Sequence, residues 1–137
     1  MIRPWPVQKA IYTRLVADST LMGMVTSIVD EPDQNAGFPY ILIGEMTATP
    51  DDVLDTTGGN HTCTIHFWDK DQPMSRVKQI MGRSGWVLHD AKLVLTATLP
   101  GNIGGGQVFT CRVEWQEAIR DVDTIHGLMR VRVGTFG

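Results

Sequence analysis

Two histidines and a cysteine lie close together in the middle of the chain, and residues of these types can bind zinc. They are His61, Cys63 and His66. The alternation of polar and apolar residues from His61 to Trp68 predicts a β-strand, in which successive side chains point to opposite faces. His61 and Cys63 then share one face, and His66 lies on the other. The sequence also lacks the paired spacings Cys-x-x-Cys and His-Glu-x-x-His, so we expect no metal site here.

A second candidate for metal chemistry is the dipeptide His89-Asp90, which metal-dependent phosphohydrolases also use. Such a site needs a second histidine and a distant aspartate as further ligands. Here the pair follows a predicted helix, where a histidine suits the negative end of the helix dipole and an aspartate can begin a turn. A structural role is the preferred interpretation, and a small metal-dependent hydrolase that uses His89 and Asp90 remains an alternative.

Other catalytic patterns are missing from the sequence. The glycine-rich stretch 101–106 lacks the Gly-Lys-Ser/Thr of a phosphate-binding loop, and it joins two predicted strands. Cys63 and Cys111 have no positioned base nearby in the sequence, and both occupy apolar positions of predicted strands. We therefore expect two reduced thiols in the core. The sequence predicts no catalytic residue and no cofactor.

Three aspartates, Asp51, Asp52 and Asp55, lie in the stretch Thr47–Asn60, which reads as a long loop between two strands. They could bind calcium, but the dense oxygen spacing and the glycine of a calcium loop are missing. The stretch holds almost no large apolar residue. We expect it to pack poorly within one subunit and to become ordered against a neighbouring molecule, with the three aspartates as interface candidates.

The elements that position these residues follow from hydrophobic periodicity. Helical spacing is found from Val7 to Leu15 and from Met74 to Leu88. Strand patterns cover residues 39–46, 61–68, 93–99, 108–117 and 125–133. This order predicts an α+β fold: a single-layer, mostly antiparallel β-sheet covered on one face by two α-helices, with a long β–β loop. The length of 137 residues predicts a single domain over residues 1–137.

Strand alternation also predicts which side chains form the core. We expect one sheet face to pack against the apolar stripes of the two helices. The predicted core residues are Cys63, Phe67, Cys111, Val113 and Trp115 on the sheet, and Ile11, Leu15, Val77, Ile80 and Leu88 on the helices. Trp86 falls opposite the stripe of its helix, so it is either exposed or returned to the core by a kink at Gly85.

Charge is distributed unevenly along the chain, which has a net charge of −3. Between Arg14 and Lys70 there are nine acids and no lysine or arginine, whereas the remainder holds all twelve basic residues and six acids. Arg76 and Arg83 lie on the predicted second helix. A molecule with one negative and one positive edge can pack head to tail with copies of itself, and we expect Arg76, Arg83 and an exposed Trp86 at such a contact. The pattern argues against a nucleic-acid reader, which would carry a basic stripe.

The sequence predicts neither a signal peptide nor a membrane-spanning run. No apolar region follows the first six residues, and no run of 18 apolar residues exists. We therefore expect the protein to stay in the cytoplasm of the cell that makes it.

A set of short segments occurs in a recognisable order over nearly the whole chain. In sequence these are Val7–Leu15, Asp18–Leu21, Phe38-Pro39-Tyr40, Gly44-Glu45, His61-Thr62, Phe67-Trp68, Leu88–Ala91, Arg120-Asp121, His126-Gly127 and the alternating Arg130 and Arg132. This ordered set resembles the tail-completion, or tail-terminator, proteins of long-tailed bacteriophages and of related gene-transfer particles.

The resemblance implies a structural protein of the virion tail or neck, assembled in the host cytoplasm. Such proteins form a hexameric ring that ends the tail tube and presents a surface to the head-side connector. The implied partners are further copies of the chain, the major tail tube protein and the connector or stopper protein. Genomic DNA would pass through the ring without sequence-specific binding. Another neck protein, such as the stopper on the head side, is the alternative.

Overall fold

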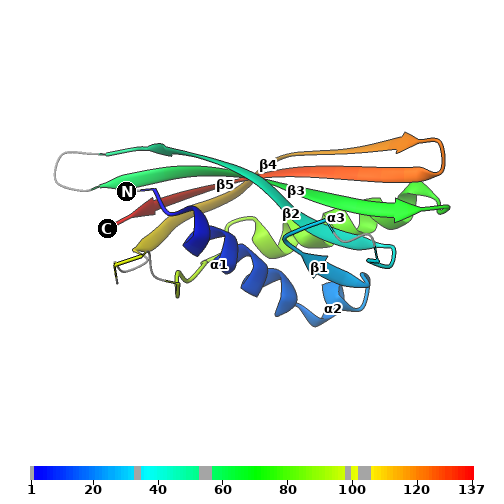
Figure 1. Ribbon diagram of the computed structural model, residues 1–137, viewed down its shortest axis with the longest axis horizontal. Coiled ribbons are helices and arrows are strands. Elements are labelled where there is room, and N and C mark those ends of the chain that lie inside the picture. Colours follow the sequence, from blue (N-terminus) through cyan, green and yellow to red (C-terminus); the bar gives the residue numbers. More distant parts are fainter. Residues whose placement is uncertain (1, 33–34, 53–56, 98–99, 102–105) are drawn as a thin grey trace.

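The computed structural model describes residues 2–32, 35–52, 57–97, 100–101 and 106–137, and its main feature is a five-stranded β-sheet (Figure 1). The strand order is β1-β2-β3-β5-β4, so β1 and β4 form the two edges. β1 runs parallel to β2, and the other neighbouring pairs are antiparallel. The strands are β1 (Ser27–Val29), β2 (Tyr40–Pro50), β3 (Gly58–Lys70), β4 (Gln107–Asp121) and β5 (Thr124–Phe136).

The described helices lie on one face of this sheet, and the other face is open (Figure 1). The helices are α1 (Pro4–Val16), α2 (Ser19–Met22) and α3 (Met74–Leu88). Asp18 caps α2, because its carboxylate accepts a hydrogen bond of 2.9 Å from the backbone nitrogen of Leu21. This architecture confirms the predicted α+β class. None of the helices in the described ranges is both long and apolar enough to cross a membrane.

The core lies between the sheet and the helical layer, as strand and helix periodicity predicts. Val113 is partly buried against this core. The other predicted core side chains, except Trp115, are almost completely buried: Cys63, Phe67, Cys111, Ile11, Leu15, Val77, Ile80 and Leu88. On β5 the alternation also holds, with Met129, Val131 and Val133 buried and the intervening arginines exposed.

The prediction that Trp115 points into the core is wrong, because β4 contains a β-bulge. Val113 pairs with Val131, and Trp115 pairs with the next residue back along β5, Arg130. One extra residue in β4 therefore reverses the facing of the side chains that follow. Trp115 is 41% exposed. The inward position passes to Gln116, whose Nε2 donates a hydrogen bond of 2.9 Å to the backbone oxygen of Met81.

A second irregularity in β4 explains why Phe109 is also exposed, although alternation predicts it inside. The register shifts between Val108 and Thr110, so Phe109 is the extra residue. Its ring lies beside Gly134 of β5, where a Cβ atom would come within 2.7 Å of the phenyl ring. Cys111, between the two bulges, keeps the predicted inward facing.

The predicted long loop Thr47–Asn60 is mostly an extended β-hairpin, which Figure 1 shows reaching away from the helices. β2 and β3 remain paired from Thr47, opposite Thr62, to Pro50, opposite Gly59. Threonine favours extended backbone, and the alternation of Thr47 and Thr49 with small residues suits a strand that has no helix above it. The connection is therefore 51–57. We call residues 46–63 the hairpin arm; Asp55 lies outside the described residues.

The predicted strand at 93–99 is also wrong for the part that the structure describes, since residues 91–97 have no regular secondary structure. Leu93 and Ala97 are buried, so the apolar pattern reflects contact with the core. The backbone nitrogen of Asp90 donates a hydrogen bond of 2.8 Å to the oxygen of Cys111, which attaches the start of this segment to β4. Residues 98 and 99 lie outside the described residues.

Candidate functional site

His61 and Cys63 are buried on the helical side of the sheet, and His66 lies on the open side, as predicted. The Nε2 atom of His61 accepts a hydrogen bond of 2.7 Å from the backbone nitrogen of Arg3. Its Nδ1 atom lies 3.1 Å from the backbone oxygen of Val133, to which it donates. The Nε2 contact therefore attaches the N-terminal segment to the sheet, and the Nδ1 contact fixes the ring against β5. Burial lowers the pKa of His61, which favours the neutral ring.

Four side chains from three strands form a cluster on the open face of the sheet that strand alternation alone does not reveal. The Nε2 atom of His66 lies 2.5 Å from Oε1 of Glu45, and its Nδ1 atom lies 2.8 Å from Nε2 of His126. The ring of His126 stacks on Trp68 at a centroid distance of 3.8 Å. The hydrogen bond from His66 lowers the pKa of Glu45, and burial followed by the charge of His66 lowers the pKa of His126. The outward facing of His66 and His126 is visible in the sequence, but their meeting depends on the β3–β5 register.

The lowered pKa values of His61 and His126 predict that stability depends on pH. A histidine in the unfolded chain titrates at about 6.5. Between that pH and the lower folded pKa, the unfolded chain binds more protons, so stability is complete above about pH 6.5 and decreases as the pH falls. We expect a lower melting temperature at pH 5 than at pH 7.5, measured by circular dichroism. His126→Gln should reduce this difference; equal melting temperatures at both pH values for the unaltered chain would contradict the prediction.

His89 and Asp90 follow the end of α3 and have local structural roles. The Nδ1 atom of His89 accepts a hydrogen bond of 3.0 Å from the backbone nitrogen of Val113 on β4. Asp90 has a φ of 58°, a left-handed conformation that aspartate tolerates in turns. In the described part of the chain, no group of three or more histidine, cysteine or acidic side chains is arranged to hold a metal ion.

The two cysteines are buried and free. Burial raises the pKa of Cys63 and of Cys111 to about 12. Thiols with such pKa values remain protonated at neutral pH, and the thiolate is the nucleophilic form. Both side chains therefore act as small apolar core residues, as predicted.

Asp51 and Asp52 lie at the described end of the hairpin arm. The backbone nitrogen of Asp51 donates a hydrogen bond of 3.0 Å to the oxygen of Gly58, and a carboxylate oxygen of Asp52 accepts one of 3.0 Å from the nitrogen of Gly58. Both side chains remain exposed. The arm therefore presents carboxylates at its end, and their expected role at an interface stays a prediction.

Trp86 is exposed, which decides between the two alternatives that its position in the helix left open. Its side chain is 71% exposed on α3. The guanidinium of Arg83 lies 4.5 Å from the centre of the indole ring. Two hydrogen bonds of 2.9 and 2.8 Å join that guanidinium to Asp18, and they lower the pKa of Asp18 to about 2. A large aromatic side chain is thus held on the surface by a paired arginine.

Arg76, the other expected interface cation, also pairs within the subunit. Its guanidinium donates hydrogen bonds of 2.8 and 2.7 Å to the buried carboxylate of Asp69. The arginines of α3 therefore join the helical layer to β3 and to the start of α2. This differs from the expectation of arginines free to meet an acidic edge of another subunit, and any interface role of Arg76 and Arg83 stays a prediction.

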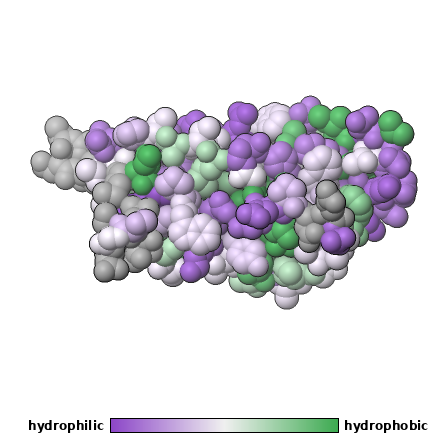
Figure 2. Space-filling model, viewed as in Figure 1, coloured by the Kyte–Doolittle hydropathy of each residue, from purple (hydrophilic) through white to green (hydrophobic). Residues whose placement is uncertain are grey.

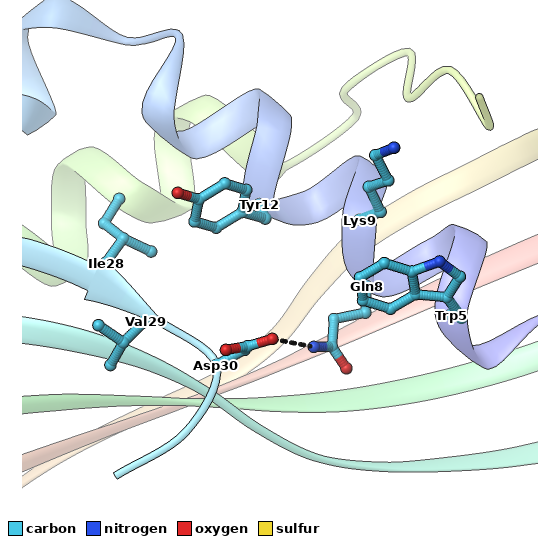
Figure 3. Close-up of a pocket in the computed structure, with 7 residues that line it drawn as sticks. All are labelled: Trp5, Gln8, Lys9, Tyr12, Ile28, Val29 and Asp30. Carbon is cyan, nitrogen blue, oxygen red and sulfur yellow. Dashed lines mark hydrogen bonds between the residues drawn. The ribbon is translucent and has the colours of Figure 1, made fainter. Parts of the chain in front are cut away.

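A groove lies between the outer side of α1 and the edge strand β1, at residues that no sequence motif marks as a site. Its volume is about 410 Å³ (Figure 3). It is lined by Trp5, Gln8, Lys9, Tyr12, Ile28, Val29 and Asp30. A hydrogen bond of 3.5 Å from Gln8 to Asp30 joins its two sides. The sequence does contain a signal for this groove. Trp5 and Tyr12 are seven residues apart, so they lie on the same side of α1, separate from the side that packs on the core.

Comparison with known sequences identifies the family. The family model for the tail completion protein gp17 matches residues 9–135. The tail completion protein gp17 of Bacillus phage SPP1 is 32% identical over 62 residues, which are 45% of this chain and 46% of that protein. The alignment with this curated relative therefore spans about half of the relative's length.

Two solved structures have a similar fold. A chain in the virion of a native gene transfer agent particle superposes with a TM-score of 0.79 at 21% identity, over 95% of this chain and 94% of that one. The gp17 protein of bacteriophage SPP1 superposes with a TM-score of 0.61 at 24% identity, over 96% and 94% of the two chains. The family match covers most of the chain, and the protein therefore belongs to the tail completion protein gp17 family, a family of structural proteins of the virion tail and not of enzymes.

Proposed function

We propose that the protein completes the tail by forming a closed ring of six subunits at the end of the tail tube. The ring would present one surface to the tube and another to the head-side connector, and DNA would pass through its centre. The subunit number follows from the resemblance to tail terminators. Membership of the tail completion family supports a role in the tail. The ring, its two surfaces and the passage of DNA through it are our inference.

The observation that carries the proposal is that the two edges of the sheet are unlike. One edge is the short strand β1, beside α1. The groove residues Ile28 and Val29 show this neighbourhood. The other edge is the long strand β4, beside α3. A contact between one kind of edge and the other is heterologous, and a heterologous contact whose rotation closes produces a ring. Exposed ion pairs contribute only about 0–1 kcal/mol each, so apolar anchors such as Trp86 would supply most of the affinity.

The hairpin arm supports a contact outside the subunit. It extends away from the helical layer (Figure 1). Asp51 and Asp52, both exposed, lie at its described end. We propose that it reaches either the neighbouring subunit or the tail tube. If its end faces the lumen of the ring, its negative charge repels the DNA backbone and lets DNA move without binding.

Removing the end of the arm tests this role. Deleting Asp51 to Thr57 and closing the hairpin with a two-residue Asn-Gly turn should preserve the fold, because short turns of this kind suit paired strands. We expect an unchanged melting temperature and a loss of completed tails, counted by electron microscopy after complementation. The double change Asp51→Asn with Asp52→Asn is the control for charge alone. Normal numbers of completed tails from the deletion variant would contradict the proposed role of the arm.

The location of the protein on assembling particles separates a tail terminator from a stopper. Gold-labelled protein should bind to the ends of tail tubes that lack heads. Labelling confined to the portal of DNA-filled heads would instead support the stopper alternative and contradict this proposal.

A further inference from the structure

The turn between β4 and β5 presents an apolar side chain in an unfavourable backbone conformation. Val122 is 88% exposed and has a φ of 56°. A β-branched residue in the left-handed region is a true outlier, and glycine or asparagine would fit better there. Such strain is found where the surrounding structure enforces it, often at functional positions. Figure 2 shows apolar surface at this end of the molecule, on the right of the view.

Contacts behind the turn hold it in a fixed position. The backbone nitrogen of Asp71 donates a hydrogen bond of 2.9 Å to the oxygen of Asp123. Arg120 donates one of 2.7 Å from its guanidinium to the backbone oxygen of Gln72. These contacts attach the turn to the connection between β3 and α3. Val122 is therefore an exposed apolar side chain on a rigid support, so a partner that covers it need not order a loop.

The groove between α1 and β1 has the aromatic walls, the volume and the charges that would suit the Val122 turn. Two of its walls are the aromatic side chains of Trp5 and Tyr12, which are 52% and 41% exposed (Figure 3). Its volume of about 410 Å³ is ample for a valine side chain and its flanking backbone. It also contains one base, Lys9, and one acid, Asp30.

The charges beside Val122 match those in the groove. Arg120 and Asp121 precede it in the chain, and Asp123 follows it. The carboxylate of Asp123 lies 3.9 Å from the ammonium of Lys70, which leaves Arg120 and Asp121 as the base and the acid available to a partner. Within the described residues, neither Lys9 nor Asp121 has an ion-pair partner. A docked turn could place Asp121 near Lys9 and the remaining guanidinium donors of Arg120 near Asp30, since opposite charges at a contact fix its orientation.

We propose that the Val122 turn of one copy docks into the α1–β1 groove of the next copy, with Val122 between Trp5 and Tyr12. The turn lies at the β4 edge of the sheet and the groove at the β1 edge, so each copy offers both halves of the contact on opposite sides. The contact is heterologous and can repeat around a ring. This inference rests on the proposed ring and names one contact between its subunits, in addition to the surface around Trp86.

Disulfide trapping on tail tubes tests the contact directly. The protein is prepared as Tyr12→Cys, as Val122→Cys and as the double variant; the native thiols are buried and do not compete. Under mild oxidation, a mixture of the two single variants should form covalent dimers, and the double variant should form longer covalent chains. Tyr12→Cys mixed with Val94→Cys is the control, since Val94 is also exposed but lies elsewhere, and it should form no dimers.

The outcomes distinguish this contact from the ring itself. Rings visible by electron microscopy without a covalent dimer in the Tyr12→Cys and Val122→Cys mixture would overturn the proposed contact and leave the ring intact. A covalent product between Tyr12→Cys and the tail tube protein would also overturn it, because the groove would then have a different occupant. The absence of rings for the unaltered chain would overturn the proposed function.

A pair of matched substitutions gives an independent test. Val122→Asn should relieve the strain, so the melting temperature of the monomer should stay equal or rise, whereas the association constant should fall at least tenfold. Val94→Asn should change neither quantity. Lys9→Glu should weaken association to a similar degree, and Asp121→Lys in the same chain should restore it. Unchanged association for Val122→Asn, or no recovery in the double charge reversal, would contradict the proposal.

Discussion

Replacing Phe67 with alanine is expected to lower the free energy of unfolding by about 3–5 kcal/mol. Phe67 lies in the middle of β3, is 1% exposed and packs beside Gly127 of β5 and Met81 of α3. Its removal would leave a cavity between the sheet and the helical layer that rigid neighbours cannot fill. Because domains of this kind are stable by about 5–15 kcal/mol, the loss is a large fraction of the total. Urea denaturation of the two proteins measures it.

Trp115→Ala is the matched control for this prediction. Trp115 is a larger aromatic residue, but the bulge in β4 places it on the exposed side, with the guanidinium of Arg130 5.5 Å from its ring. We expect a loss below about 1 kcal/mol, since an exposed cation–π contact contributes about 0.5–1 kcal/mol. A loss at Trp115 equal to that at Phe67 would show that the strand faces in the opposite direction.

Trp86→Ala is expected to reduce assembly at least thirtyfold while the melting temperature of the monomer changes little. The side chain is 71% exposed, so its removal leaves no cavity. Tryptophan at the centre of an interface often contributes about 2 kcal/mol or more, which corresponds to roughly thirtyfold in the association constant. Arg83 contacts both the indole ring and Asp18, so the ring is already fixed in the free subunit, which would reduce the entropy lost on association. Sedimentation velocity across a concentration series measures the effect.

Trp86→Phe provides the control, because it keeps an aromatic ring next to Arg83. Its association should lie much closer to that of the unaltered protein. We also expect association to weaken only modestly between low and high salt, because the proposed contact depends mainly on apolar side chains and exposed ion pairs contribute little. Equal assembly by Trp86→Ala and the unaltered protein would exclude this side chain as an anchor.

Local periodicity is sufficient to predict which side chains face the core where a helix or strand is regular and packs on one side. The alternation of β3 assigned Cys63 and Phe67 to the core and His66 to the open face, and the structure agrees. It fails in β4, because a bulge adds one residue without any mark in the pattern of polar and apolar residues, so the pattern places Trp115 on the wrong face. It also failed at Leu93, whose burial against the core has the same local pattern as a strand.

The candidate site is harder to predict from the sequence than the fold, because it depends on contacts between residues that are far apart in the chain. The exposure of Trp86 depends on whether α3 stays straight at Gly85, which local propensity does not decide. The pairing of Arg83 with Asp18 joins residues 65 positions apart, and the groove requires β1 to lie beside α1. Such contacts follow from topology and register, which are properties of the whole fold.

The mass of the assembled particle is the most direct test of the central claim that this protein completes tails as a ring. Native mass spectrometry and light scattering should be carried out at high protein concentration, with and without isolated tail tubes. We predict a discrete particle of six chains, either free or bound at one end of each tube. A protein that remains strictly monomeric under both conditions and never binds tube ends would contradict the account.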